Sequence, residues 1–242
     1  MKRREFLRGT ALTLGMAGVA GALPAGDPSM AGHLAGGGPL RAPEGRKINV
    51  AFLIAEGANV IDLAGAWEVF QDVHVPGRGE SMDEIMPFRL YTVAATRDPI
   101  TATGGLRIVP NYTFDDAPAP DLISVGAQRG SEAGWAWLAA TAPQTQLTMS
   151  VCTGAFQLGG AGLLDGLTAT THHDFYDDFA ARFPKVAVER GLRFVEHDRI
   201  ATAGGLTSGI DLALRTVERY FGRDVAQATA DYMEYQSIGW HV

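Results

Sequence analysis

Short apolar runs alternate with helical segments along this 242-residue chain, and this alternation constrains the fold more than any other feature. The run from Lys47 to Ile54 is largely apolar and rich in β-branched residues, as a strand buried on both faces should be. The segment from Ala64 to Val73 follows, with apolar residues at helical spacing. Strands that alternate with helices form parallel sheets with helices on both faces. We therefore predict an α/β fold built on such a sheet.

The two patterns recur along the rest of the chain. Further strands are predicted at 88–94, 121–125, 146–151 and 167–170. Further helices are predicted at 131–140, 153–164, 174–183, 207–221 and 224–235, with a two-stranded stretch before Gly204-Gly205. Since 46% of the residues are hydrophobic, the chain can bury one substantial core. One folded domain is expected over residues 47–242.

The charge distribution argues against two classes of partner. The net charge is -7, and no cluster of Lys and Arg occurs after the first eight residues. Nucleic acids and anionic membranes select a basic patch, which this pattern lacks. We therefore expect a small-molecule substrate and no nucleic-acid partner.

The N-terminal residues have the order of an export signal. Arg3-Arg4-x-Phe6-Leu7 resembles the twin-arginine consensus, and a Gly- and Ala-rich apolar run continues to about Leu23. That run is short and interrupted by glycine, whereas a membrane span needs about 20 apolar residues. We expect a cleaved twin-arginine signal at 1–25, a flexible Gly/Pro/Ala linker at 26–46, and a periplasmic or extracellular product without a stable membrane anchor.

Cys152 is the only cysteine and lies where a predicted strand meets a predicted helix. In open α/β sheets the ligand crevice lies at the carboxyl ends of the strands. A thiol at a helix N-terminus also meets unpaired N–H groups, which can lower its pKa. Gly154 would let a substrate oxygen approach these N–H groups. Position alone leaves open that Cys152 is a small buried hydrophobic residue.

Four motifs around Cys152 occur in the order found in a known superfamily. They are Ser150-Val151-Cys152-Thr153-Gly154, Ala161-Gly162-Leu163-Leu164-Asp165-Gly166, Ala169-Thr170-Thr171-His172 and Thr202-Ala203-Gly204-Gly205-Leu206-Thr207-Ser208-Gly209-Ile210-Asp211. Over about residues 47–235 the chain resembles the ThiJ/PfpI superfamily. The resemblance implies a flavodoxin-like, class I glutamine amidotransferase-like fold, and it implies a homodimer.

Within that superfamily the chain looks most like isocyanide hydratases and the sensor halves of AraC-type regulators. The resemblance implies that Cys152 is a nucleophile and that Asp62, in the loop after the first strand, is its acid/base partner. Asp62 could instead cap the helix that begins at Ala64. Thr153 is a further candidate catalytic residue, through its side chain or its backbone N–H. The candidate substrate-binding or oxyanion positions are Gly126, Ala127, Gly154, His172 and Gly205.

Several residues depart from the superfamily pattern. Thr153 stands where the proteases have histidine, so we expect no protease. The usual Pro-Gly-Gly turn is replaced by Val125-Gly126-Ala127-Gln128, and His173 replaces a tryptophan, so no particular substrate is assigned.

The remaining histidine, capping and tryptophan residues are interpreted as structural. His172 and His173 could shuttle protons or bind metal, but adjacent side chains usually diverge and no third ligand has a suitable spacing, so no metal site is predicted. Asp174 and Thr207 are expected to cap helices. Packing is expected for three aromatic residues, Trp67, Trp135 and Trp137.

Three functions are compatible with these residues. The first is a cofactor-independent, cysteine-dependent hydratase or lyase acting on a small electrophile. The second is glyoxalase- or deglycase-type action on α-oxoaldehydes, for which Glu56 would be the acid/base. The third is a ligand-binding or oxidation-sensing domain without turnover. Because no helix-turn-helix segment follows Tyr235, direct control of transcription is not expected.

Overall fold

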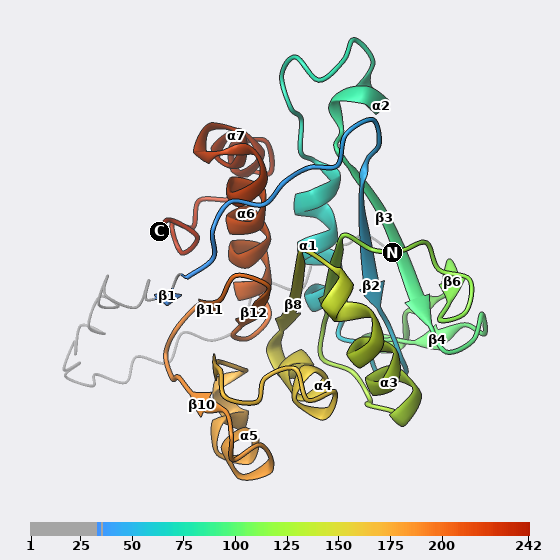
Figure 1. Ribbon diagram of the computed structural model, residues 1–242, viewed down its shortest axis with the longest axis vertical. Helices are drawn as coiled ribbons and strands as arrows, with labels where there is room; N and C mark the ends of the chain where they lie inside the picture. Colours follow the sequence, from blue (N-terminus) through green and yellow to red (C-terminus); the bar gives the residue numbers. More distant parts are fainter. Residues whose placement is uncertain (1–32, 35) are drawn as a thin grey trace, which may run out of the picture.

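The computed structural model describes residues 33–34 and 36–242. The predicted signal peptide, residues 1–25, lies outside the described residues. Among the described residues, eight strands form one central sheet (Figure 1). In spatial order they are β1 (His33–Leu34), β11 (Phe194–Glu196), β12 (Ile200–Ala203), β8 (Leu147–Val151), β7 (Leu122–Val125), β2 (Ile48–Leu53), β3 (Phe88–Ala94) and β6 (Tyr112–Thr113).

Neighbouring strands of this sheet are parallel, except that β11 runs antiparallel to β12. The chain first pairs β2 with β3 and then crosses back to add β7, β8 and β12 on the other side of β2. The direction of strand addition therefore reverses beside β2, and such a reversal leaves a ligand crevice at the carboxyl ends of the strands. Two small ribbons lie outside the central sheet and pair β4 (Ile100–Thr101) with β5 (Arg107–Ile108), and β9 (Thr168–Ala169) with β10 (Ala187–Val188).

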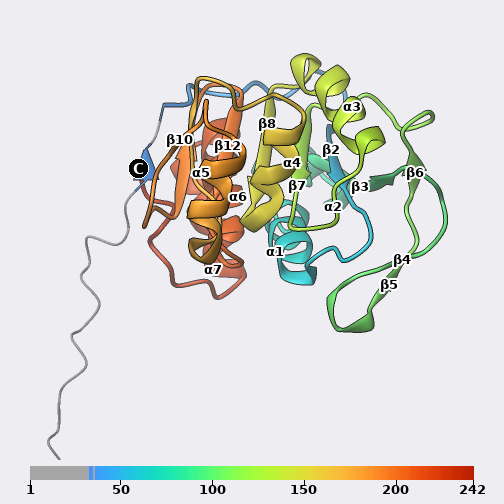
Figure 2. The same cartoon turned by 90° about the horizontal axis from the view of Figure 1, so that it is seen from below.

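Helices cover both faces of the sheet (Figures 1 and 2). The first face carries α1 (Val60–Gln71), α6 (Ser208–Phe221) and α7 (Arg223–Tyr232). The second face carries α3 (Glu132–Thr141), α4 (Ala155–Gly160) and α5 (Tyr176–Arg182). A short helix, α2 (Met82–Ile85), has no buried residue. The predicted α/β fold with helices on both faces is confirmed.

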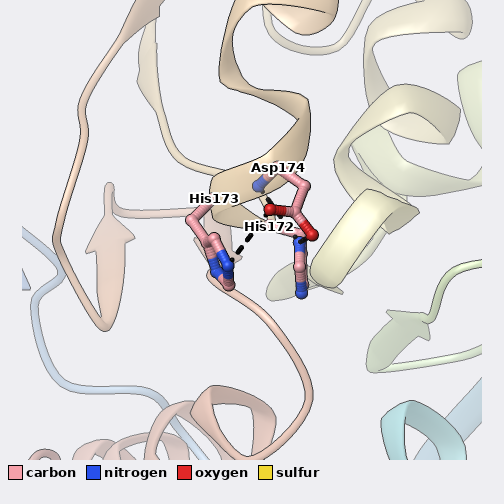
Figure 3. Close-up of side chains that lie close together, drawn as sticks. All are labelled: His172, His173 and Asp174. Carbon is pink, nitrogen blue, oxygen red and sulfur yellow. Dashed lines mark hydrogen bonds and ion pairs between the residues drawn. The ribbon is translucent and has the colours of Figure 1, made fainter.

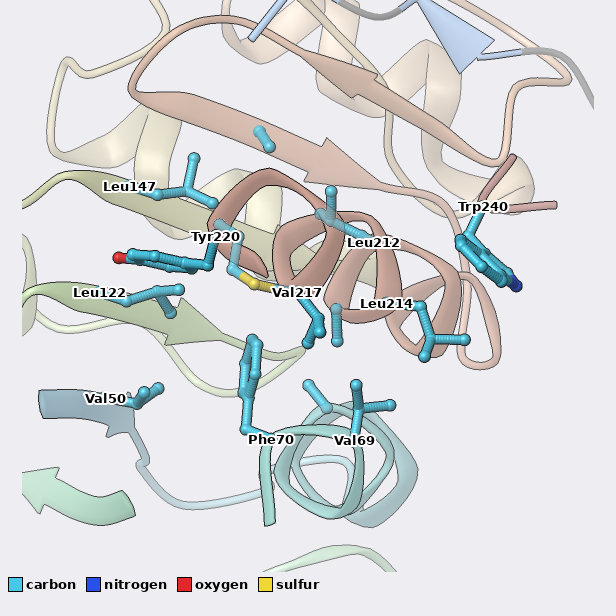
Figure 4. Close-up of a cluster of buried hydrophobic side chains, with 14 of the residues drawn as sticks. Val50, Val69, Phe70, Leu122, Leu147, Leu212, Leu214, Val217, Tyr220 and Trp240 are labelled. Atoms are coloured by element: carbon cyan, nitrogen blue, oxygen red, sulfur yellow. The ribbon is translucent and has the colours of Figure 1, made fainter. Parts of the chain in front are cut away.

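Alternating side chains of the strands divide the interior into two cores. In β2, Val50 enters the core beneath α1 and α6, whereas Ala51 enters the core beneath α3, α4 and α5. Figure 4 shows the first core, where Val69 and Phe70 of α1 point toward α6. Burial of this apolar surface, at about 25 cal/mol per Å², is the main stabilising contribution to the fold.

Several helix boundaries differ from the sequence expectation because other residues provide the caps. α1 begins at Val60 and Asn59 caps it, so Asp62 lies in the first turn and does not cap the helix. Asp174 caps neither the short turn His173–Phe175 nor α5, and Thr207 precedes α6 without a side-chain cap bond. Within the described residues, no helix has the length and apolar character needed to cross a bilayer.

The described part of residues 26–46 packs against the domain and is not the flexible linker that its composition suggested. β1 pairs with β11, and Leu40 is buried in the first core with its N–H donating to the carbonyl of Arg219. The guanidinium of Arg219 donates to the carbonyl of Gly38 at 2.8 Å and to Glu196 at 2.9 Å. The Gly-rich composition did not predict this docking, because Arg219, which bonds Gly38, is 181 residues away from it in sequence.

Candidate active site

Four adjacent strands bring the candidate residues to one edge of the sheet. Asp62 follows β2, Ala127 follows β7, Cys152 follows β8, and Leu206 follows β12. Because these strands are parallel, their carboxyl ends lie at the same edge. The edge coincides with the reversal in strand order, where the crevice of such sheets is expected.

Cys152 occupies a strained turn between β8 and α4. Its φ is 59°, in the left-handed region that residues with side chains seldom adopt. Its N–H donates to the carbonyl of Gly204 at 2.7 Å, and its carbonyl accepts from the buried hydroxyl of Thr171 at 2.9 Å. These two bonds hold the N–H and the carbonyl of Cys152, so the surrounding structure keeps this residue in its strained conformation and fixes the direction of its side chain.

Asp62 is held beside Cys152 by one of its two carboxylate oxygens. Its Oδ2 accepts from the N–H of Ala127 at 2.9 Å, and the residue is 1% exposed. Gly126 permits this approach, because a Cβ there would lie 2.8 Å from the Cβ of Asp62. The second oxygen, Oδ1, is buried and has no hydrogen-bond partner of ordinary geometry among the described residues, while the thiol of Cys152 interacts with the same carboxylate. A buried acceptor left open in this way is a candidate for proton transfer.

Burial raises the pKa values of both reactive groups. It raises the pKa of Asp62 to about 6, although the N–H of Ala127 and the thiol of Cys152 oppose the rise. Burial and the charge of Asp62 raise the pKa of Cys152 to about 11. The lowered thiol pKa expected from the sequence is therefore wrong. The reason is that Cys152–Gly154 form a tight turn in a buried place, with α4 beginning only at Ala155.

Two backbone N–H groups face the sulfur and favour its anionic form. They belong to Thr153 and Leu206, and both lower the pKa of the Cys152 thiol. Leu206 has φ 52° and was not singled out from the sequence, because a leucine gives no signal for a left-handed turn. Thr153 was a candidate catalytic residue from the sequence, through its side chain or its backbone N–H, and the structure places the N–H toward the sulfur.

Two expected oxyanion positions have other roles in the structure. The N–H of Ala127 is used by Asp62. Gly154 is required for packing, because a Cβ there would lie 2.1 Å from the carbonyl oxygen of Val125. Its lack of a side chain allows the turn after β8 to lie against the end of β7.

His172, His173 and Asp174 form a polar cluster at the rim of the site (Figure 3). The two rings stack with centroids 4.3 Å apart, so the expected divergence of the two side chains is wrong. Asp174 lies 3.2 Å from His173 Nε2, and its N–H donates to His172 Nδ1. The cluster offers three ligand atoms within 4.8 Å of one another, but Nδ1 of His172 is already an acceptor. His172 also packs on Gly205, where a Cβ would lie 2.3 Å from its ring, so this glycine serves close approach.

Glu56, the acid/base of the α-oxoaldehyde hypothesis, lies elsewhere. It is exposed, and its carboxylate accepts from the N–H of Thr101 in the β4–β5 ribbon at 3.1 Å. Asp62 is therefore the carboxylate of the first loop that meets the thiol.

A comparison with protein families agrees with this geometry. The model of the DJ-1/PfpI family matches residues 48–219, which include Asp62, Cys152 and Leu206. The chain belongs to the DJ-1/PfpI family. The matched range covers the sheet from β2 to β12 and ends within α6.

Curated proteins similar to this chain include an enzyme and a transcriptional regulator. An isonitrile hydratase of Pseudomonas putida is 31% identical over 195 residues, which are 78% of this chain and 78% of that protein. The HTH-type transcriptional regulator GbdR of Pseudomonas aeruginosa is 30% identical over 196 residues, which are 78% of this chain and 51% of the regulator. The crystal structure of a ThiJ/PfpI family protein from Pseudomonas syringae is 26% identical, with a TM-score of 0.65, and covers 90% of this chain and 84% of that one.

Proposed function

We propose that this DJ-1/PfpI protein is a cofactor-independent hydratase that adds water to a small electrophile, with Cys152 as nucleophile and Asp62 as acid/base. The arrangement of Asp62 is the main support. One carboxylate oxygen accepts from the N–H of Ala127, the other is buried with no further hydrogen-bond partner among the described residues, and the carboxylate interacts with the thiol of Cys152. The likeness to an isonitrile hydratase supports isonitriles as the substrate class.

The protonation states of Cys152 and Asp62 suit nucleophilic addition. Near neutral pH the thiol keeps its proton and Asp62 is largely ionised, since their pKa values are about 11 and about 6. The pair thus holds one proton, and its titration belongs to both groups together. Asp62 can take that proton as the sulfur attacks, and the N–H groups of Thr153 and Leu206 stabilise charge on sulfur.

The first half of the reaction forms a covalent adduct. The sulfur of Cys152 bonds to the terminal carbon of R–N≡C while the thiol proton passes to Asp62. Asp62 then delivers this proton to the same carbon, giving R–N=CH–S–Cys152. The carboxylate is thereby regenerated as a base.

The second half releases the product. Asp62 takes a proton from water as the water oxygen bonds to the adduct carbon, and that proton goes to the substrate nitrogen. The C–S bond of the resulting R–NH–CH(OH)–S–Cys152 breaks, the sulfur takes the hydroxyl proton, and R–NH–CHO leaves. The sum is one isonitrile plus one water giving one formamide, with the thiol restored.

Turnover of two substrate classes by the wild type and by Cys152→Ser tests the proposal. The wild type should convert cyclohexyl isocyanide to its formamide, detected by NMR, and should act on methylglyoxal far more slowly. Cys152→Ser should lose at least a thousandfold in kcat/KM while its circular dichroism is unchanged. Full activity in Cys152→Ser would falsify the proposal, and so would methylglyoxal turnover without isonitrile hydration.

We also propose that the protein is exported by the twin-arginine route and acts as a homodimer. The Arg3-Arg4-x-Phe6-Leu7 pattern supports export, and membership of the family supports the dimer. The double variant Arg3→Lys with Arg4→Lys should remain in the cytoplasm, as measured by cell fractionation. Light scattering on the purified protein should give twice the chain mass, and a monomer mass would refute the dimer.

A further inference from the structure

A cavity of about 350 Å³ adjoins the candidate active site on the face that carries α3, α4 and α5. Thr153, which follows Cys152, lines it, and so does Gln128, which follows Ala127. Consecutive Cα atoms are about 3.8 Å apart, so two residues of the cavity wall are direct neighbours of the site. One is next to Cys152, and the other is next to Ala127, whose N–H bonds Asp62. Ligand pockets are commonly about 300–1,000 Å³, so a ring-sized group fits here.

One wall of the cavity is a fixed indole ring. Nε1 of Trp135 donates to Oε1 of the buried Gln157 at 2.9 Å, and Nε2 of Gln157 donates to the carbonyl of Gln128 at 3.1 Å. Two glycines make room for the ring, because a Cβ at Gly130 or Gly160 would lie 2.8 Å or 2.7 Å from it. Trp135 therefore forms a preorganised wall as well as packing, which the sequence interpretation did not anticipate.

Two phenylalanines extend this apolar surface. Phe156 and Phe175 line the cavity and meet edge to face, with ring centroids 6.4 Å apart. Phe175 is 40% exposed, so part of its ring is accessible to a ligand in the cavity. Three aromatic residues around one cavity select a flat apolar group, since aromatic rings pack favourably edge to face or offset.

Arg182 supplies a positive charge at the same cavity. Its guanidinium carbon lies 5.9 Å from the ring centre of Trp135 and 5.5 Å from that of Phe183. In the described part of the chain no carboxylate lies within ion-pair distance of Arg182, whereas Arg190, on the same face, pairs with Asp177. A guanidinium without a carboxylate partner is suited to a planar anion, which it can bind through two N–H groups.

We propose that this cavity is the specificity pocket and that it takes an aromatic substituent bearing a carboxylate, with the ring against Trp135 and the carboxylate on Arg182. The oxygen and the nitrogen of the Gln157 amide are both used within the protein, and the Arg182 guanidinium is the positive charge in the wall that can recognise an anion. The substrate class is therefore an aryl electrophile with a carboxylate remote from the reacting carbon. The proposal rests on the proposed hydratase function for its chemistry but not for its binding.

A matched pair of substrates tests the proposal. The probes are 4-isocyanobenzoate and phenyl isocyanide, which share the ring and differ in the carboxylate. The wild type should favour the carboxylate probe in kcat/KM, and Arg182→Gln should reduce that preference at least fivefold. Arg190→Gln is the control, because it removes an arginine from the same face and should leave the preference unchanged. A preference that Arg182→Gln does not alter would overturn the proposal.

A binding measurement separates this proposal from the proposed function. Benzoate should bind to the Cys152→Ala protein, shifting the NMR signal of the Trp135 indole N–H, and Arg182→Gln in that background should weaken the binding at least fivefold. If neither isocyanide is hydrated but benzoate binding depends on Arg182, the hydratase function fails and the pocket stands. If benzoate does not shift the indole signal, or shifts it equally in both proteins, the pocket proposal is wrong.

Discussion

Two aspartates lie beside reactive side chains in this protein, and their surroundings differ. Asp62 is 1% exposed, and no hydrogen bond of ordinary geometry reaches its Oδ1 from the residues that the structure describes. The side chain of Asp174 is 67% exposed, and its oxygens lie 3.7 Å from Nδ1 of His172 and 3.2 Å from Nε2 of His173. Burial raises the pKa of Asp62 to about 6, close to the range in which a base and its conjugate acid can alternate. The same residue type is therefore prepared for proton transfer at one place and is solvated and paired at the other.

The comparison teaches that burial with one open oxygen, rather than the nearness of a reactive neighbour, makes a carboxylate useful for catalysis. Histidine next to aspartate is a common catalytic pairing, yet here the pair at the rim is exposed to water. The less conspicuous Asp62 is buried, and its pKa is raised to about 6. The predictions below separate the two sites.

Removal of the Asp62 carboxylate should give the largest effect. Asp62→Asn keeps the shape of the side chain but cannot cycle a proton, so kcat should fall by about 10²–10⁴, the usual contribution of a general acid/base. Steady-state kinetics with an isonitrile measures this. A change of less than threefold would show that the open oxygen has no catalytic role.

The pH dependence should locate the same group. Below about pH 6 Asp62 is protonated and cannot accept a proton, so kcat/KM should fall about tenfold per pH unit as the pH decreases. Above this pH the rate should level off, since the thiol retains its proton up to about pH 11. This decrease of kcat/KM at low pH should persist in Asp174→Asn and vanish in Asp62→Asn. If Asp62→Asn shows the same decrease, the titrating group is another residue.

The stability of the fold should respond to Asp62 with a definite sign. Its pKa is raised in the folded state, so ionisation destabilises the fold at high pH and the penalty disappears as the pH falls below 3.8. Asp62→Asn should therefore raise the free energy of unfolding by about 3 kcal/mol at pH 8 and by about 1 kcal/mol at pH 4.5. Urea unfolding at both pH values measures the difference, and a variant less stable than the wild type at pH 8 would contradict it.

Two glycines allow the sites to be disturbed separately. Gly126→Ala places a methyl group 2.8 Å from the Cβ of Asp62 and should destabilise the fold by about 1–3 kcal/mol and lower kcat. Gly205→Ala presses on the ring of His172. Unfolding and kinetics of both variants should show the larger loss of kcat in Gly126→Ala. The reverse order would place the important geometry at the rim.

Asp174→Asn should give the smallest effect. The contacts of Asp174 with the two histidines are at the surface, and such contacts contribute about 0–1 kcal/mol, so the free energy of unfolding should fall by less than about 1 kcal/mol. Turnover should change less than twofold. A large loss of activity would show that the His172–His173–Asp174 cluster takes part in the reaction.

Local sequence patterns contained most of the fold and the centre of the site. Parallel strands bring their carboxyl ends together, which placed Cys152 at the crevice, whereas its pairing with Asp62 was implied by the resemblance to the ThiJ/PfpI superfamily. The left-handed turn at Leu206 could not be predicted, because local rules assign such turns to glycine. The direction of the Cys152 pKa shift also depends on burial and on the charge of Asp62, which are properties of the folded molecule.

The docking of residues 36–46 has a practical consequence for anyone who shortens this chain. Arg219 is 6% exposed and bonds Gly38, Glu196 and the carbonyl of Asp198. Cutting the chain after Gly38 would remove one of these partners and open a buried charged group to water. A shortened chain that keeps β1 must therefore begin ahead of His33, and an N-terminal purification tag must be joined ahead of that residue.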